Sequence, residues 1–156
     1  MSLPSSSHAY GIGLIAVIIG TAVGVSYYQL YFIPELNAKP IISDKVLHPG
    51  QTTTIIIVPG AENQAQEQNF VPKKIESQLG ESNLIIWKNT GDIGHTVTPD
   101  KPFKDLYSGE FGSPAIIQPG KEYQFLFTQE AQITYHCEPH PWMKGEINVV
   151  HGALTS

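Results

Sequence analysis

The first hydrophobic segment of the chain is long and uninterrupted. Residues 9–33 contain no Asp, Glu, Lys or Arg and are rich in Ile, Val, Gly and Ala. A helix of that length is about 37 Å long, and the hydrocarbon core of a bilayer is about 30 Å thick. Aromatic residues gather at its end, as they do at membrane interfaces: Tyr27, Tyr28, Tyr31 and Phe32. With Pro34 as its stop, the pattern predicts a transmembrane helix over residues 9–33.

A cleaved signal peptide is the alternative interpretation of this segment. Against it stand its length, the absence of Lys and Arg from the tail at residues 1–8, and the lack of a clear Ala-x-Ala site. We therefore expect an uncleaved single-pass anchor in the cell membrane, with the following domain on the extracytoplasmic (periplasmic) side. Lys39 and Lys45 weakly favour the opposite orientation, but large domains translocate largely regardless of such charges.

The pattern changes after the anchor. Residues 34–40 form a short linker, and residues 41–156 contain short runs that are β-branched or alternate between apolar and polar positions. Such runs, separated by Gly, Pro and Asn, are typical of strands joined by turns; they include Thr52–Val58, Leu84–Lys88, Tyr123–Phe127, Ile133–Cys137 and Glu146–Val150. About seven or eight strands predict an all-β sandwich over residues 41–156, without a helical period anywhere in it.

Composition excludes several classes of function. The net charge is −5 and Lys plus Arg number only 9, so nothing indicates a nucleic-acid footprint. Cys137 is the single cysteine, which rules out a disulfide within the chain. A lone thiol in an oxidising compartment is a liability unless it is buried or bound to a metal.

One short motif carries chemistry that the rest of the domain does not. Cys137, His140 and Met143 follow one another at three-residue intervals, so a thiolate, an imidazole and a thioether can converge from one tight loop. Pro139 and Pro141 hold that loop rigid, which argues against a chance cluster in a core strand. These ligand types are those of a blue-copper site, which has two His and one Cys in a trigonal plane and a weak axial Met.

The second histidine of such a site has to come from elsewhere in the chain. His95 is the best candidate, because the loop between Gly91 and Gly94 can bring it close to the ligand loop. His136 neighbours Cys137 but lies on the opposite face of an alternating strand, so it should not reach the same metal. The remaining histidines are expected at the surface: His8, His48 and His151.

Residues around the expected ligands have secondary roles. Pro139 has no N–H and cannot donate to the Cys137 sulfur, which leaves the backbone N–H of Thr96 as the best donor. Around His140, an exposed collar through which electrons pass is expected from Glu138, Pro139, Pro141 and Trp142. The alternative for Trp142 is that it packs into the core, as tryptophan commonly does.

These residues resemble the cupredoxin family, most closely its amicyanin and plastocyanin-like members. The resemblance rests on the Cys137-x-x-His140-x-x-Met143 motif and on the upstream His95-Thr-Val-Thr segment, and it covers about residues 50–150. It implies a Greek-key β-sandwich, one type 1 copper ion cycling between Cu(I) and Cu(II), and a carrier of single electrons between a redox donor and acceptor. Thr96 departs from the family, whose Asn at that position ties the two ligand loops together, and the anchor suggests a tethered carrier.

Other copper proteins fit the sequence less well. An oxidase subunit II also combines an anchor with a copper-binding sandwich, but its two-copper centre needs two bridging cysteines. Nitrite reductases and multicopper oxidases need further His-rich sites, and a copper store needs labile, exposed ligands. We therefore predict that the chain is not an enzyme. The alternative kept open is a copper-binding subunit of a larger membrane oxidoreductase complex.

Overall fold

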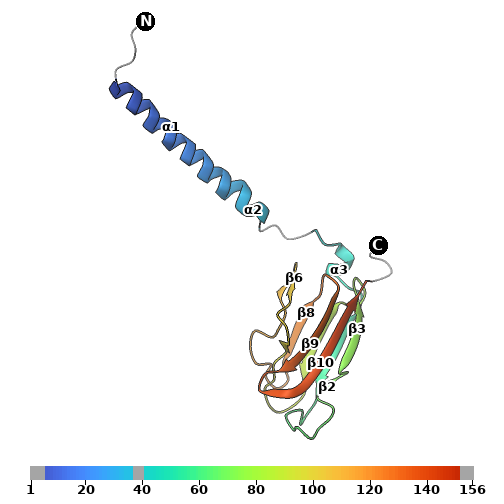
Figure 1. The fold of residues 1–156 in the computed structure, drawn as a ribbon. Coiled ribbons are helices and arrows are strands. Elements are labelled where there is room, and N and C mark those ends of the chain that lie inside the picture. Colours follow the sequence, from blue (N-terminus) through green and yellow to red (C-terminus); the bar gives the residue numbers. More distant parts are fainter. Residues whose placement is uncertain (1–5, 37–40, 152–156) are drawn as a thin grey trace. The chain divides into compact units, whose positions relative to one another are not determined.

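The computed structural model describes residues 6–36 and 41–151. The chain divides into two units, Met1–Lys39 and Pro40–Ser156. Figure 1 shows the first as a continuous helical stretch and the second as a β-rich domain.

The first unit is helical throughout its described part. It comprises α1 (Ser6–Tyr27), a π-helical turn η1 (Tyr28–Phe32) and α2 (Ile33–Leu36). The stretch Tyr10–Leu36 has 27 residues with a mean hydropathy of 1.8, which makes it long and apolar enough to cross a membrane. Helical structure thus continues past Pro34, where the sequence suggested that it stops.

The π-helical turn explains how the chain accommodates the proline. Pro34 has no N–H and its ring crowds the preceding turn, so a regular α-helical bond pattern cannot continue through it. The N–H of Ile33 instead bonds to the carbonyl of Tyr28, five residues back, which widens the helix just before the proline. A local change of helix type therefore replaces the predicted stop.

The second unit contains two four-stranded sheets. The first sheet has the order β2 (Phe70–Val71), β1 (Thr52–Ile57), β4 (Leu84–Asn89), β8 (Glu122–Leu126). The second sheet has the order β3 (Lys74–Gln78), β10 (His140–Val150), β9 (Ala131–Cys137), β5 (Thr98–Pro99). A separate hairpin pairs β6 (Lys104–Asp105) with β7 (Gly109–Glu110), and one helical turn, α3 (Asp44–Leu47), precedes β1. No helical period in the sequence indicates that turn.

Strand pairing follows the alternation seen in the sequence. In β9 the residues Ile133, Tyr135 and Cys137 are buried while Thr134 is exposed, so one face of the strand points into the core. The parallel pairs β1–β4 and β3–β10 each join strands that are distant in the sequence, and β9 pairs antiparallel with β10. The end of β9 and the start of β10 therefore lie side by side.

An aromatic cluster fills the space between the sheets. Trp87 and Tyr135 are fully buried, with ring centroids 5.7 Å apart, and Phe70 contacts Tyr135 edge-on at 5.0 Å. Tyr123 stacks on Trp87 at 5.3 Å, and burial raises the pKa of Tyr123 to about 12. These rigid rings support β9 two residues before Cys137, so the core directly underlies the candidate site.

Candidate metal centre

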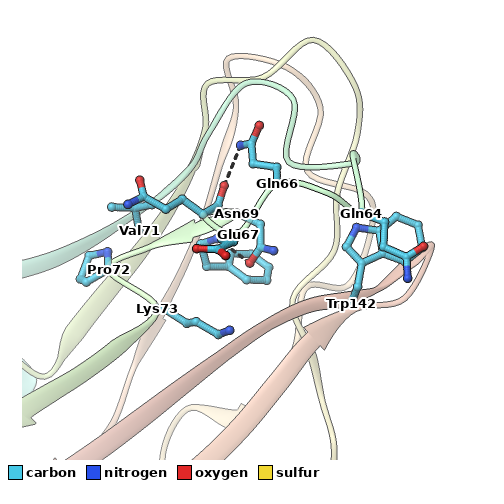
Figure 2. A pocket seen from close by; sticks show the side chains of 10 residues that line it. Gln64, Gln66, Glu67, Asn69, Val71, Pro72, Lys73 and Trp142 are labelled. Carbon is cyan, nitrogen blue, oxygen red and sulfur yellow. Dashed lines mark hydrogen bonds between the residues drawn. The ribbon is translucent and has the colours of Figure 1, made fainter.

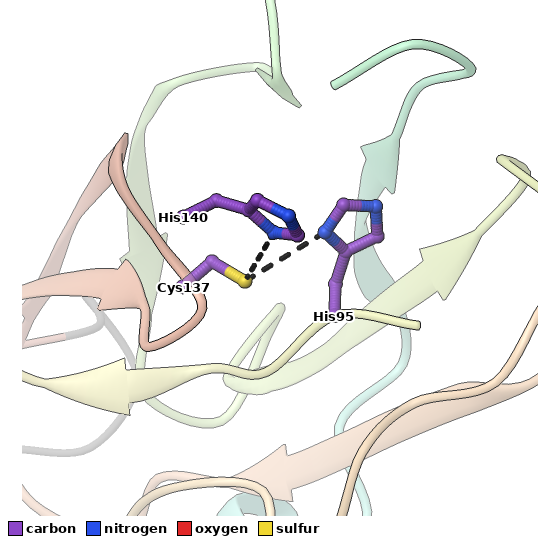
Figure 3. A group of neighbouring side chains, drawn as sticks. All are labelled: His95, Cys137 and His140. Atoms are coloured by element: carbon purple, nitrogen blue, oxygen red, sulfur yellow. Dashed lines mark hydrogen bonds between the residues drawn. The ribbon is translucent and has the colours of Figure 1, made fainter. Parts of the chain in front are cut away.

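The structure brings three of the predicted ligand residues together. The Nδ1 atoms of His95 and His140 lie 3.6 and 3.5 Å from the Cys137 Sγ atom, and one ligand atom from each residue can be chosen so that all lie within 4.8 Å of one another. Figure 3 shows both imidazole rings directed at the sulfur. The ring centroids of the two histidines are 5.2 Å apart.

Each of these side chains is positioned by backbone pairing. Cys137 ends β9 and His140 begins β10, and the two residues are register partners across the turn between them. His95 lies outside the named strands but bridges to Ile117, with N–H to carbonyl distances of 3.2 and 2.7 Å in the two directions. Two segments more than forty residues apart in sequence are thus fixed against each other by the sheets.

The spacing of the donor atoms fits a single metal ion. Metal bonds of about 2.3 Å to a thiolate and about 2.0 Å to an imidazole, at angles between tetrahedral and trigonal, put the sulfur and nitrogen about 3.5–3.7 Å apart. Both observed separations fall in this range. One thiol and two imidazoles are the donor set that copper takes in trigonal electron-transfer sites.

Burial keeps one of these imidazoles in its metal-binding form. His95 is fully buried. Desolvation, followed by the influence of His140, holds the pKa of His95 below its usual value, although Glu62 acts in the opposite direction. Because a metal binds the neutral imidazole, a lowered pKa reduces competition from protons.

Met143 lies in the irregular part of β10. The pairing of β10 with β9 shifts register between His140 and Lys144, which places Met143 within the bulged segment. Its side chain is fully buried. A bulge re-aims side chains at functional sites, and here the methionine of the bulged segment is buried three residues after His140.

Thr96 links the two ligand segments. Its N–H donates to the Cys137 Sγ at 3.4 Å, and its hydroxyl accepts a hydrogen bond from the N–H of Glu138 at 2.8 Å. The hydroxyl also lies 3.1 Å from that of Thr98 and 4.0 Å from the sulfur. The sequence left open whether a threonine can join these loops, and the structure shows that it does so through one short side chain.

Removing that hydroxyl should loosen the Cys137 segment. Thr96→Val keeps the shape of the side chain but leaves the Glu138 N–H without its acceptor, a loss of about 1–2 kcal/mol in the free energy of unfolding. Thr96→Ser is the matched control because it retains the oxygen. Urea unfolding of the copper-free protein measures both, and equal stability of the valine and serine variants would contradict the bridging role.

The predicted collar around His140 is only partly exposed. Glu138, Pro139 and Pro141 are exposed, and His140 is half-buried. Trp142 is partly buried, packs against the hydrophobic core, and contacts the His140 ring edge-on at a centroid distance of 5.4 Å. Trp142 therefore lies beside His140 and also packs against the core.

The structure adds residues that sequence reasoning missed. The Asn89 side-chain amide donates to the carbonyls of Ile93 and Ile117 at 2.7 and 2.8 Å, and its oxygen accepts from Gly91 at 2.9 Å. It therefore holds both the loop before His95 and the segment that bridges to it. Asn89 opens an Asn-Thr-Gly turn, and that turn was its only signal in the sequence.

Two exposed isoleucines also flank the His95 loop. Ile93 and Ile116 are 37% and 51% exposed, and a Cβ on Gly94 would overlap the side chain of Ile116. The apolar surface at this end of the domain is thus wider than the ligand loop alone. Nothing in the alternation of the sequence distinguishes these two residues from core isoleucines.

The other described histidines lie away from the cluster. His136 points to the opposite face of β9, as the alternation requires, and its Nδ1 lies 2.6 Å from the Asp100 carboxylate. His48 and His151 are exposed beside Asp44 and Glu130, at 3.8 and 3.5 Å. The side chain of His8 falls outside the described part of the chain.

Comparison with known proteins decides the family. Residues 57–150, more than half of the chain, match the family model for copper-binding proteins of the plastocyanin/azurin family. The chain belongs to this family. It is therefore a cupredoxin, as its ligand motif predicted, and its cofactor is a type 1 copper ion, which the His95–Cys137–His140 cluster fits.

Several solved structures of copper proteins are similar to this chain. A purple cupredoxin from Nitrosopumilus maritimus is similar at a TM-score of 0.51 and 22% identity, over 63% of this chain and 99% of that one. Amicyanin from Paracoccus versutus is similar at a TM-score of 0.46 and 18% identity, over 73% of this chain and 94% of that one. A mutant of amicyanin in its Cu(I) form gives 0.46 and 21%, over 64% and 82%. The predicted all-β, cupredoxin-like sandwich behind one apolar helix is confirmed.

Proposed function

We propose that this cupredoxin is a membrane-tethered carrier of single electrons, in which His95, Cys137, His140 and Met143 hold one type 1 copper ion. The observation that carries the proposal is the convergence of two imidazoles and one thiol, from two distant segments, on a space that fits one metal. The bound copper would supply one-electron chemistry by alternating between Cu(I) and Cu(II).

The protein's own contribution is to keep the donor atoms in place. Cys137 and His95 are fully buried, and each is fixed by strand or bridge hydrogen bonds. The N–H of Thr96 donates to the sulfur, which orients the thiolate and moderates its electron density. A site that is already arranged needs little rearrangement when its charge changes, and this favours fast electron transfer.

The half-buried imidazole of His140 is the proposed point of electron exchange. Around it lie the exposed Glu138, Pro139 and Pro141, with the edge of Trp142 in contact with the ring. A small apolar surface with a charge at its rim suits brief encounters between redox proteins, whose interfaces are at the low end of the size range. The donor and the acceptor are therefore expected to be redox proteins.

The apolar helix supports a tether in the cell membrane, with the copper domain on the extracytoplasmic side. The segment Tyr10–Leu36 has the length and hydropathy of a membrane span. Mass spectrometry of the chain extracted from membranes distinguishes an anchor from a cleaved signal. An intact N-terminus supports the tether, and loss of the first thirty or so residues would contradict it.

Copper loading tests the function directly. The full chain in nonionic detergent should bind one copper ion per chain and give one reversible one-electron wave in voltammetry. It should not consume nitrite or oxygen in the presence of excess reductant, because an electron carrier has no substrate to turn over. Two copper ions per chain, or sustained consumption of either substrate, would point to an enzyme subunit instead.

A further inference from the structure

Three lysines gather on the outer side of the sheet that carries Cys137. We call this group, Lys73, Lys74 and Lys144, the lysine face. All three are exposed and line one hollow of about 480 Å³. The whole chain has 9 Lys and Arg against 14 Asp and Glu, a net charge of −5. The lysine face is positively charged although the protein as a whole is acidic, so it is suited to bind a negatively charged partner.

The carboxylates in the same hollow do not cancel this charge. Glu146 lies 2.9 Å from the Lys74 ammonium, but the lysine side chain is 69% exposed and the glutamate only 28%, so the cation is the outer group. Asp100 bonds to His136 at 2.6 Å and also attracts Lys144. Three ammonium groups against two carboxylates leave one net positive charge in this hollow.

A fourth lysine extends the positive region. Lys101 is exposed and lines the adjoining hollow, which shares Thr134 with the first. The positive region therefore covers more than one strand of the sheet.

The lysine face adjoins the metal centre. Lys144 directly follows Met143 in the chain, and its register partner His136 directly precedes Cys137. Lys73 also lines a second hollow of about 630 Å³ together with Trp142 and the acidic Glu67, and Figure 2 shows these side chains at that hollow. Trp142 in turn contacts the ring of His140. A partner seated on the lysines therefore reaches the side of His140 that Trp142 covers.

We propose that the lysine face is the docking surface for an acidic redox protein. The proposal rests on the electron-carrier function above and names the chemistry of its partner. Charge complementarity with the lysines supplies orientation and a fast encounter, and the Trp142 edge brings the partner to His140. A redox protein is favoured over a lipid surface because the lysine face is continuous with the residues that flank the metal centre.

Two double variants isolate the contribution of the lysine face. Lys73→Gln/Lys144→Gln removes two positive charges there and leaves the Lys74–Glu146 ion pair intact. Lys88→Gln/Lys121→Gln removes two exposed charges associated with the other sheet and changes the net charge equally. The full chain in nonionic detergent is reduced and then oxidised by hexacyanoferrate(III), which takes one electron and becomes hexacyanoferrate(II). The rate constant is measured as a function of salt.

The sign of the salt dependence is the deciding result. A protein of net charge −5 repels a trianion, so salt should accelerate the reaction if only net charge matters. Attraction by the lysine face predicts that salt slows it. At low salt the Lys73/Lys144 double variant should react at least about threefold more slowly, while the Lys88/Lys121 double variant should match the wild type. Acceleration by salt, or equal rates for both double variants, would overturn the proposal.

A binding measurement identifies the class of partner. Amide chemical shifts of the copper-free full chain are recorded during titration with polyglutamate and, separately, with phosphatidylglycerol added to the detergent micelles. Changes centred on residues 73, 74 and 144 with polyglutamate, and lost in the Lys73/Lys144 double variant, support a protein partner. Stronger changes with the anionic lipid would assign the lysine face to the membrane and overturn the proposal.

A cationic oxidant separates failure of this inference from failure of the proposed function. Tris(phenanthroline)cobalt(III) should oxidise the reduced wild type and both double variants, since it does not depend on the lysine face. If the cobalt complex oxidises the protein but salt accelerates oxidation by hexacyanoferrate(III), only the docking surface is contradicted. If neither reagent oxidises the reduced protein, the proposed electron-carrier function is itself contradicted.

Discussion

Replacing Cys137 with serine should abolish the intense visible absorption of the Cu(II) protein. That absorption arises from charge transfer between the thiolate and copper, and Cys137 is the only cysteine in the chain. The fully buried side chain differs from serine by one atom, so the fold should remain intact, which far-ultraviolet circular dichroism verifies. Visible spectra of the two proteins, loaded with equal copper, measure the effect.

The matched control for this change is Met143→Leu. An axial methionine is a weak, long ligand, so its removal should leave the thiolate absorption in place and alter only its position and the reduction potential. If the Cys137→Ser protein kept its absorption, the sulfur would not be a copper ligand. If Met143→Leu lost the absorption as completely as Cys137→Ser, the assignment of a weak axial role would be wrong.

Adding a methyl group at Gly145 should be the most destabilising small change in the domain. Gly145 is the register partner of Tyr135, and a Cβ at this position would overlap the tyrosine ring. The ring cannot move aside, because it is fully buried against Trp87 and Phe70. Gly145→Ala should therefore lower the free energy of unfolding by about 3 kcal/mol, through overpacking of a filled core.

Two control variants show whether the clash is the cause. Gly50→Ala adds the same methyl group where no atom lies within 4 Å, and it should be nearly neutral. In a Tyr135→Leu background the overlapping ring is absent, so Gly145→Ala should cost much less there than in the wild type. Thermal unfolding measures the stability of each copper-free protein: the wild type, Gly145→Ala, Gly50→Ala, Tyr135→Leu and the Tyr135→Leu/Gly145→Ala double variant. An undiminished cost in the Tyr135→Leu background would locate the effect in the backbone instead of the ring.

Local patterns in the sequence predicted much of the site. Alternation from Ile133 to Cys137 placed Cys137 inward and His136 outward, because successive residues of a strand face opposite sides. The spacing of Cys137, His140 and Met143 pointed to copper chemistry without any knowledge of the fold. His95 was found by requiring a fourth ligand from a loop, and the structure brings it beside the sulfur.

Features that depend on contacts between distant segments were not predictable in this way. Asn89 ties the His95 loop to the Ile117 segment through a hydrogen bond to a carbonyl 28 residues away, which no local pattern encodes. The hydroxyl of Thr96 reaches Glu138 across 42 residues. The lysine face arises because β3 and β10 are parallel neighbours, which places Lys74 beside Glu146. Each of these follows from strand pairing, and pairing is a property of the whole domain.

X-ray absorption at the copper edge tests the central claim most directly. The protein loaded with one copper ion should show one sulfur at about 2.2–2.3 Å and two nitrogens at about 2.0 Å from the metal, and Cys137→Ser should remove the sulfur. Such a shell would establish that the cluster of His95, Cys137 and His140 holds copper. A copper ion surrounded only by nitrogen and oxygen in the wild type would contradict the account, because it would place the metal outside this cluster.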